Sequence, residues 1–236
     1  MGSLAPSTSH PTGRPRDARR AILDAGEELF AIQGFAATTI KQIGARAGLN
    51  TALLYYYFPN KLGLYRAVLG RIGTGLKQLA GPPLKQARTP EAVVRALIRG
   101  QTQLVLRHPR AAALLIRELL DYEASNAAPM IRSLATDLFR PVVAAINEGK
   151  ERGSIRPDLN GELATISAIA QLMYFTLAKP LIRVLLEKGA EYPNQDDVRT
   201  FGRHAEEFAV AGMAPRTVAT RDHRVAQRTE RSRGRK

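Results

Sequence analysis

Residues 38–61 have the sequence TTIKQIGARAGLNTALLYYYFPNK, and its spacing predicts two short helices joined by a tight turn. Thr39 is placed to cap the first helix, because a threonine side chain can accept a hydrogen bond from a free backbone N–H. Apolar residues then recur at helical spacing and give this helix one buried face. Gly48 supplies the turn, and Asn50 is placed to cap the second helix.

The second helix of this unit has one apolar side and one outward side. Leu54 and Phe58 lie four residues apart and form the stripe that anchors the helix. Asn60 is placed to cap a third helix, where Lys61 can meet a phosphate. A short helix with small residues at its start and tyrosines one turn later fits a DNA major groove, which is ~12 Å wide. Those outward residues are Thr51, Ala52, Tyr55 and Tyr56.

The ordered landmarks of this stretch are the paired threonines, the AGLNT turn, the YYYF run and the final lysine. Together they resemble the helix-turn-helix of the tetracycline-repressor (TetR/AcrR) family of bacterial regulators. The resemblance is specific over residues 16–62 and only architectural over 63–213. It implies phosphate contacts from Thr39, Tyr56 and Lys61. It implies groove-facing positions that read bases for Lys41, Asn50, Thr51, Ala52 and Tyr55.

The stretch departs from the family's common pattern at three positions. Tyr57 stands where a histidine is frequent, and Ala52 stands where a glycine is frequent. Gly44 replaces a usual alanine inside the first helix, which costs a helix ~0.5–1 kcal/mol. The expected fold survives these changes. Ala52 and Tyr57 bear on the base sequence that is read and on the docking distance, so individual base contacts are not assigned.

The composition excludes several classes of protein. The chain has 236 residues and 44% of them are hydrophobic, which is ordinary for a protein with a buried core. It has no cysteine and no tryptophan, so disulfide scaffolds, thiol nucleophiles and cysteine-ligated metal sites are excluded. No run approaches the ~20 apolar residues that span a membrane, and the N-terminal residues lack the apolar core of a secretory signal. We expect a cytoplasmic protein with no membrane partner.

The formal net charge of +14 favours a polyanionic partner, because basic side chains release counterions when they bind DNA. The charge is uneven along the chain. Residues 214–236 carry eight basic and two acidic side chains and little apolar material, which predicts a basic disordered tail. Residues 1–15 are rich in Ser, Pro, Thr and Gly and predict a disordered arm. Each end is either a DNA contact or a solvated terminus, and the sequence leaves both open.

The periodicity predicts an all-α protein of about nine helices in two parts. Residues 16–62 form the first part, a helix-turn-helix DNA-binding domain with three helices. Its first helix is expected to run from about Asp17 to Gly34 and to pack an apolar stripe on the pair of short helices. Residues 63–213 form the second part, a larger helical bundle that the family resemblance assigns to ligand binding and dimerisation.

Proline positions predict where the helices of the second part stop or bend. A longer helix starts at Lys61, and the GPP motif at 81–83 is expected to stop it near Ala80. Pro141 is expected to bend a later helix, and Pro180 to kink or end another. The remaining helices are expected at about 90–107, 110–123, 129–151, 161–188 and 196–212, the last capped by Asp196 or Asp197.

The sequence contains no pattern typical of catalysis or metal binding. It has no GxGxxG, Walker or GxSxG motif, so an enzyme has no visible phosphate cradle or nucleophile. The four histidines form no zinc grouping. The pairs His204 with Glu207 and Glu118 with Asp121 have a spacing that is common on helix surfaces. We therefore expect no enzymatic activity, no metal and no cofactor.

Polar residues within the helices of the second part indicate a candidate ligand pocket. A pocket between helices needs a few polar groups to orient a ligand within apolar walls. The alternative is that these side chains bond to one another or to backbone carbonyls, or lie in solvent. The candidates are Gln101, Gln103, Arg117, Tyr122, Gln171, Tyr174 and Thr176.

The last two apolar helices have two interpretations. They complete the core of the subunit, or they form a two-fold interface. The family resemblance favours the interface, in which two copies pair as a four-helix bundle and hold two DNA-reading heads about one DNA turn apart. The candidate interface residues are Leu172, Phe175, Phe201, Ala205 and Phe208.

These observations favour a sequence-specific DNA-binding transcriptional regulator. The expected mechanism is that of a ligand-responsive repressor, which releases its operator when a small molecule binds. The expected partners are a palindromic double-stranded operator, a small-molecule effector and a second copy of the chain. One alternative is a ligand-independent architectural protein whose basic tail supplies the DNA affinity. Another is a helical small-molecule carrier or enzyme.

Overall fold

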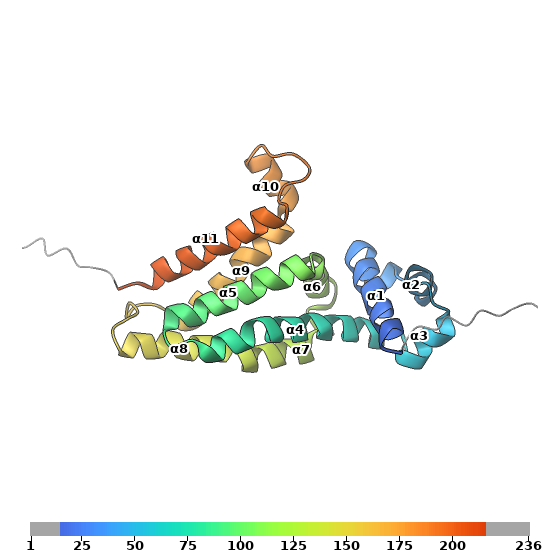
Figure 1. Ribbon diagram of the computed structural model, residues 1–236, viewed down its shortest axis with the longest axis horizontal. Coiled ribbons are helices and arrows are strands. Elements are labelled where there is room, and N and C mark those ends of the chain that lie inside the picture. The colour runs from blue at the N-terminus through green and yellow to red at the C-terminus, as the bar shows by residue number, and fades with distance from the viewer. Residues whose placement is uncertain (1–14, 216–236) are drawn as a thin grey trace, which may run out of the picture.

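The computed structural model describes residues 15–215, and their regular structure is helical with no strand. The all-α prediction is confirmed. Most of the predicted arm and tail, residues 1–14 and 216–236, lies outside the described residues. Figure 1 shows an elongated molecule with a small helical head at one end of a larger bundle. The head contains α1 (Pro15–Ala37), α2 (Ile40–Ala47) and α3 (Thr51–Tyr57).

Helix α4 (Lys61–Gln86) runs from the head along the length of the bundle, beside α5 (Figure 1). The remaining elements of the bundle follow in chain order. They are α5 (Pro90–Arg107), α6 (Ala111–Tyr122), α7 (Ala128–Leu134), the π-helical turn η1 (Ala135–Phe139), α8 (Arg140–Glu151), α9 (Gly161–Leu177), α10 (Lys179–Leu185) and α11 (Gln195–Met213).

The head packs around the apolar stripe of α1, as the sequence predicts. Ile22 and Phe30 of α1 are fully buried together with Ile43 of α2 and Leu54 of α3. Each buried side chain of this size contributes ~1.5–3 kcal/mol. The same apolar cluster continues through Tyr65 of α4 to residues of α6 and α7. The head therefore shares one core with the part of the bundle nearest to it.

Helix α1 breaks at the glycine where the sequence predicts its end. Gly34 has φ 82° and ψ 170°, a conformation outside the helical region that glycine adopts without strain. The helix continues beyond this break to Ala37. The hydroxyl of Thr38 then donates a 2.7 Å hydrogen bond to the Gly34 carbonyl. This bond fixes the turn that leads into α2.

The prediction that the GPP motif stops the linking helix near Ala80 is wrong. Helix α4 continues through both prolines to Gln86. Pro82 removes the N–H donor for the carbonyl of Gln78, but Gln78 is exposed, so water can replace that donor. Ala80 and Leu84 belong to a buried cluster shared with α5, and this packing outweighs the local cost of the prolines.

Two other predicted helices are divided, so residues 15–215 contain slightly more helices than the approximately nine expected, which is close to the prediction. The π-helical turn η1 separates α7 from α8, and Pro141 is the second residue of α8. A wider turn accommodates a proline that cannot donate to the carbonyl four residues earlier. Ala178 separates α9 from α10 just before Pro180. The last helix is capped by Asn194, and not by either of the two aspartates that were expected.

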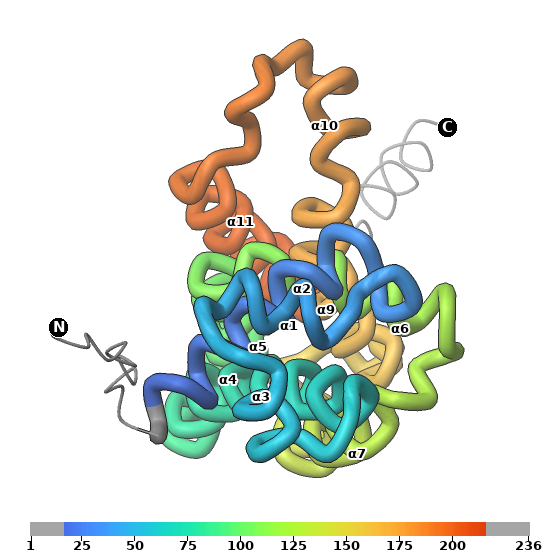
Figure 2. The backbone as a smooth tube through the Cα atoms, turned by 90° about the vertical axis from the view of Figure 1, so that its right-hand side faces the viewer, coloured from blue at the N-terminus to red at the C-terminus, as the bar shows by residue number. Residues whose placement is uncertain are grey.

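Helix α10 projects from the bundle and is joined to it through α9 and α11 (Figures 1 and 2). Leu181, Val184 and Leu185 on this helix are exposed. Among residues 15–215, no single helix is long and apolar enough to cross a membrane. Helices α9 and α10 pass that test only as a pair, and they are bent by 80° to each other.

Candidate DNA-binding interface and effector cavity

The first short helix of the head has the cap that the sequence predicts. The hydroxyl of Thr39 accepts a hydrogen bond from the backbone N–H of Gln42, and the Gln42 side chain accepts one from the backbone N–H of Thr39. This reciprocal pair satisfies two free N–H groups at the start of α2. Gly48 ends α2 in the left-handed conformation, with φ 68° and ψ 29°.

Gly44 has a role in the turn that sequence reasoning missed. A Cβ atom at this position would lie 2.8 Å from the carbonyl oxygen of Leu49, which real Cβ atoms essentially never approach so closely. The N–H of Leu49 also donates a 2.9 Å hydrogen bond to the Gly44 carbonyl. The chain therefore crosses back over α2 at the one position where no side chain blocks it. The glycine that weakens the helix permits the tight turn.

The second short helix presents the expected residues to solvent. Tyr55 is 56% exposed and Tyr56 is 79% exposed. Leu54, on the buried side of the same helix, is 1% exposed. The side chain of Asn50 caps α3 by accepting a 2.8 Å hydrogen bond from the N–H of Leu53. The other positions that the resemblance implies in DNA contact are also exposed: Thr39, Lys41, Asn50, Thr51 and Ala52.

Lys61 is bound within the head, and this position differs from that of an outward phosphate contact. Its Nζ donates hydrogen bonds to three carbonyls after the Gly34 break, at 2.9 Å to Phe35, 3.2 Å to Ala36 and 2.9 Å to Thr38. The same ammonium lies 4.4 Å from the centre of the Phe35 ring. A lysine ammonium has three donors, and all three are used here. Lys61 thus ties the start of α4 to the end of α1.

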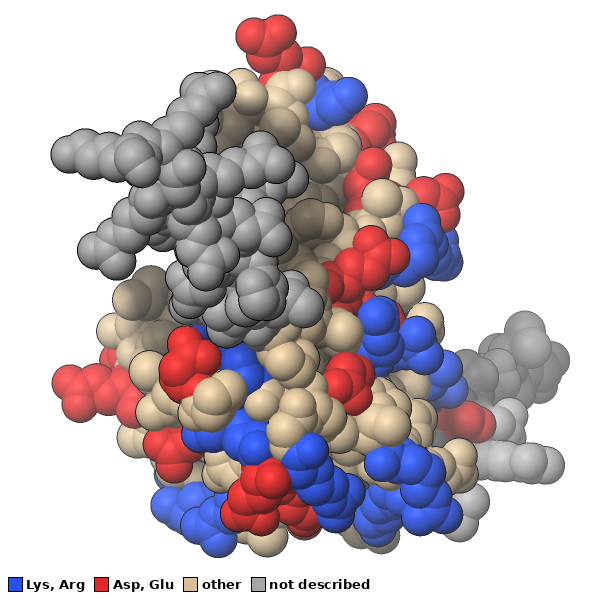
Figure 3. Space-filling view, turned by 90° about the vertical axis from the view of Figure 1, so that its left-hand side faces the viewer, with Lys and Arg blue, Asp and Glu red and all other residues tan. Residues whose placement is uncertain are grey.

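The distribution of basic and acidic side chains says less about the DNA interface than the exposure of the residues on α2 and α3 does. Lys41 on the head is exposed, whereas Arg46 pairs with Glu28 at 2.7 Å and is partly neutralised. Figure 3 shows the end of the molecule opposite the head, where basic and acidic side chains are interspersed. In this view no face of a single sign appears, so charge does not mark this end of the molecule as a DNA site.

A cavity of about 380 Å³ lies in the bundle, mainly between α5, α6, α7 and α9. This volume is within the range of sites for small molecules. Leucine, isoleucine, valine, alanine, methionine and phenylalanine side chains make up its wall, with two polar exceptions. Those exceptions are Gln101 of α5 and Glu118 of α6. The cavity is therefore suited to an apolar molecule.

Only one of the seven sequence candidates for the pocket, Gln101, lines this cavity. Gln103 and Tyr174 are exposed, and Gln171 is half-buried outside the cavity wall. The hydroxyl of Thr176 donates to carbonyls of its own helix, at 2.9 Å to Leu172. Arg117 and Tyr122 of α6 contact the end of α1 and do not line the cavity. Most of the wall consists of apolar residues, which carry no signal that distinguishes them from other core positions.

Glu118 is fully buried, and its carboxylate is held by donors of the protein. Its Oε1 accepts hydrogen bonds from the backbone N–H groups of Asn126 at 2.6 Å and Ala127 at 3.0 Å. These groups precede α7, where a negative charge is favourable. The hydroxyl of Tyr65 on α4 is also hydrogen-bonded to Glu118, and burial together with this bond raises the pKa of Tyr65. Glu118 therefore joins α4, α6 and α7 beside the cavity.

Helix α6 also contacts the head. The guanidinium of Arg117 donates to the carbonyls of Ala31 at 3.1 Å and Ile32 at 3.0 Å, which precede the Gly34 break of α1. The ring of Tyr122 packs edge-on against Phe35, with 5.9 Å between ring centres. Thus α6 both lines the cavity, through residues such as Leu115 and Glu118, and holds the end of α1, through Arg117 and Tyr122.

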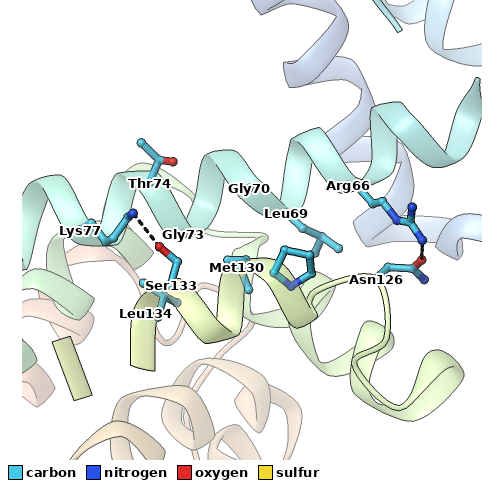
Figure 4. Close-up of a pocket in the computed structure, with 11 residues that line it drawn as sticks. Arg66, Leu69, Gly70, Gly73, Thr74, Lys77, Asn126, Met130, Ser133 and Leu134 are labelled. Carbon is cyan, nitrogen blue, oxygen red and sulfur yellow. Dashed lines mark hydrogen bonds between the residues drawn. The ribbon is translucent and has the colours of Figure 1, made fainter. Parts of the chain in front are cut away.

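A second, smaller groove of about 230 Å³ separates α4 from α7 (Figure 4). Lys77 donates to Ser133 at one end of it, and Arg66 donates to Asn126 at the other. Met130 packs against Gly73, where an added Cβ atom would lie 2.3 Å from the Met130 Cγ. Met130 and Leu134 line both spaces, and Leu76 places α4 itself in the wall of the larger cavity.

The five candidate interface residues are placed mainly inside the subunit. Leu172, Phe175 and Ala205 are buried, and the rings of Phe175 and Phe201 stack with centres 4.0 Å apart. Only Phe208 is largely exposed, at 63%. The exposed stripe of α9 lies on another side of the same helix and consists of Leu163, Ile166, Ala170 and Tyr174. Among residues 15–215, no group of three or more potential metal ligands is found.

Comparison with known proteins agrees with this geometry. The family profile of bacterial regulatory proteins, tetR family, matches residues 22–68, which cover most of the head and the start of α4. The transcriptional repressor NicS of Pseudomonas putida is 30% identical over 161 residues, which are 66% of this chain and 74% of NicS. The transcriptional repressor Rv3405c of Mycobacterium tuberculosis is 34% identical over 148 residues, 56% of this chain and 78% of that protein.

The fold is also found among solved structures. The TetR-family regulator PfmR from Thermus thermophilus superposes with a TM-score of 0.65. The match covers 83% of this chain and 96% of PfmR at 17% sequence identity, so it shows a shared fold. The capped helix-turn-helix, the helical bundle behind it and the identity to NicS lead to one assignment. The chain belongs to the TetR family of bacterial transcriptional regulators.

Proposed function

We propose that this regulator is a repressor that binds its operator as a homodimer and releases it when a small molecule enters the cavity of the bundle. The observation that carries the DNA-binding part is the exposed face of α3. The Asn50 cap and the Gly48 turn before it fix this helix, and Tyr55 and Tyr56 project from it into solvent. The proposed function requires no catalysis and no cofactor, and we place it in the cytoplasm, where the operator lies.

The exposed stripe of α9 supports dimerisation. Leu163, Ile166 and Tyr174 are each more than half exposed, and Phe208 of α11 adds a fourth large apolar side chain. A second copy related by a two-fold axis would bury the same set from both subunits. Dimerisation also fits the size of the head, because one short reading helix makes fewer contacts than specific DNA affinity normally requires.

The contacts of α6 support control by a ligand. A molecule in the cavity touches the same helix whose Arg117 holds the end of α1. The ligand shifts the equilibrium only if it binds one arrangement of α6 more tightly than another. In the proposed mechanism the liganded arrangement of α6, α4 and α1 separates the two heads by a distance that no longer matches the operator half-sites.

The test is binding of the purified protein to its own promoter fragment and to scrambled DNA of equal length. The repressor proposal predicts a preference of ~10³ or more for the promoter fragment at physiological salt. Tyr56→Ala is expected to reduce affinity for the promoter fragment, because an exposed contact of the reading helix is removed. Gln78→Ala is the matched control, since Gln78 is exposed on α4 outside the head.

A second measurement separates this proposal from a charge-driven architectural protein. A variant that ends at residue 215 lacks the basic tail and keeps every described helix. The repressor proposal predicts that it retains the preference for the promoter fragment. Equal binding to both DNAs, lost steeply with rising salt, would refute the proposal, because such binding depends on phosphates alone.

A further inference from the structure

One side chain in the wall of the cavity has a buried polar atom that the protein leaves without a partner. Gln101 lies in the wall on α5 and is 8% exposed. Among the described residues, its Oε1 has no hydrogen-bond partner. A buried acceptor without a donor costs the full desolvation of that atom, so native proteins seldom keep one. A ligand that supplies the missing donor explains why this glutamine faces an otherwise apolar space.

The other wall residues restrict the charge of that ligand. No lysine, arginine or histidine lines the cavity. An anionic ligand would therefore lose its hydration without a countercharge, which is strongly unfavourable. Glu118 is the only charged side chain in the wall, and two backbone N–H groups and the Tyr65 hydroxyl already hold its carboxylate. A cationic ligand would compete with donors that fix α7 and α4.

We infer that the effector is an uncharged, largely apolar molecule with one hydroxyl or N–H group, which donates a hydrogen bond to the Oε1 of Gln101. This inference rests on the proposed ligand-responsive function and specifies the chemistry of its ligand. The apolar wall supplies affinity through burial, and the single hydrogen bond selects among molecules of similar size. Carboxylates, phosphate esters and quaternary ammonium compounds of the same length are excluded.

The experiment compares four probes of nearly equal length by isothermal titration calorimetry on the full chain. They are decan-1-ol, its isomer nonyl methyl ether, decanoate and decyltrimethylammonium. The alcohol and the ether have the same atoms, but only the alcohol can donate a hydrogen bond. We expect the alcohol to bind about tenfold more tightly than the ether, and the two ions to bind more weakly than either.

Substitution of the glutamine tests whether this preference comes from its Oε1. Gln101→Met keeps the length of the side chain and removes the amide, so the alcohol and the ether should then bind within about twofold of each other. The same change removes an unpartnered buried acceptor, and we expect the Tm of the ligand-free protein to rise by roughly 2–4 °C. Gln103→Met on the same helix is the control, because Gln103 is exposed and outside the cavity.

Several results would overturn the inference. They are equal binding of alcohol and ether to the unmodified protein, tighter binding of either ion, no binding of the alcohol, and a preference that persists in Gln101→Met. Promoter binding without ligand is measured for the same proteins and is expected to be unchanged in the control Gln103→Met. If the promoter preference holds while the probe series fails, the ligand chemistry is wrong and the repressor remains. If the promoter preference is absent from the unmodified protein, the proposed function fails instead.

Discussion

Replacing Lys61 by methionine tests whether this residue clamps the head or contacts DNA. The change removes an ammonium that donates to the carbonyls of Phe35, Ala36 and Thr38 at 2.9–3.2 Å and lies over the Phe35 ring. A hydrogen bond to a charged group contributes ~1.5–3 kcal/mol. The bond to Ala36 is the longest and is exposed, so water replaces it at little cost. The two shorter bonds then give a loss of unfolding free energy of ~3 kcal/mol.

The same variant has a distinct expected effect on DNA binding. Each phosphate contact that is lost lowers the slope of log affinity against log salt by about 0.9. Because the protein already uses all three donors of Lys61, we expect this slope to be unchanged in Lys61→Met. Lys41→Met is the matched control, since Lys41 is exposed on the same head. It should leave stability within about 0.5 kcal/mol and weaken DNA binding.

Urea denaturation followed by circular dichroism measures the first quantity, and promoter binding at several salt concentrations measures the second. The clamp predicts a lower denaturation midpoint for Lys61→Met with the m-value retained. A Lys61→Met protein of unchanged stability whose salt slope falls by about one unit for each head would refute this reasoning. Lys61 would then be a phosphate ligand, and its carbonyl contacts would contribute nothing to the fold.

Three further predictions follow from particular contacts. Gly44→Ala places a Cβ atom 2.8 Å from the Leu49 carbonyl, so we expect a loss of ~1–3 kcal/mol in urea denaturation and weaker promoter binding; an unchanged midpoint would contradict the close turn. Ile166→Asp should convert a dimer to a monomer in analytical ultracentrifugation, whereas a persistent dimer would place the interface elsewhere. The raised pKa of Tyr65 means that its neutral form stabilises the fold below the ordinary tyrosine pKa of about 10. That stability is lost as the pH rises above this value, so Tyr65→Phe should flatten the decline in Tm at alkaline pH. Equal declines in both proteins would show that ionisation of Tyr65 does not cause the loss of stability.

The head was largely predictable because its determinants are local. Thr39, Asn50 and Asn60 each accept a hydrogen bond from an N–H three residues later, so sequence spacing alone identifies them. The partners of Lys61 are carbonyls 23 to 26 residues earlier, and sequence spacing does not reveal them. The importance of Gly44 likewise depends on where the chain passes after the turn. Local propensity assigned this glycine a cost and missed the space that it provides.

The bundle was less predictable, because its cavity is formed by helices that are distant in the sequence. Polar residues in apolar helices were candidates for a ligand site, but a polar side chain has several ways to be satisfied. Thr176 bonds to its own helix, Arg117 bonds to the head, and only Gln101 remains unpartnered in the cavity wall. Three of the five dimer candidates, Leu172, Phe175 and Ala205, are buried within the subunit for a related reason. Helix α9 is apolar on several sides, so its composition did not show which side the subunit covers.

The group that selects the ligand and the groups that hold the head are on different helices, α5 and α6. This arrangement allows the cavity to be selective for one ligand and also coupled to DNA binding. The atom that distinguishes one ligand from another is on α5, whose C-cap residue His108 lies 3.2 Å from the Glu27 carboxylate of the head. The side chains that hold the head, Arg117 and Tyr122, are on α6, which also contributes Leu115 and Glu118 to the cavity. A ligand must therefore contact both helices to report its presence. Chemistry at Gln101 sets the affinity, whereas the volume that displaces α6 sets the response. Two molecules with equal affinity can then differ in how far they release the operator, because only differential binding to the two arrangements of α6 shifts the equilibrium.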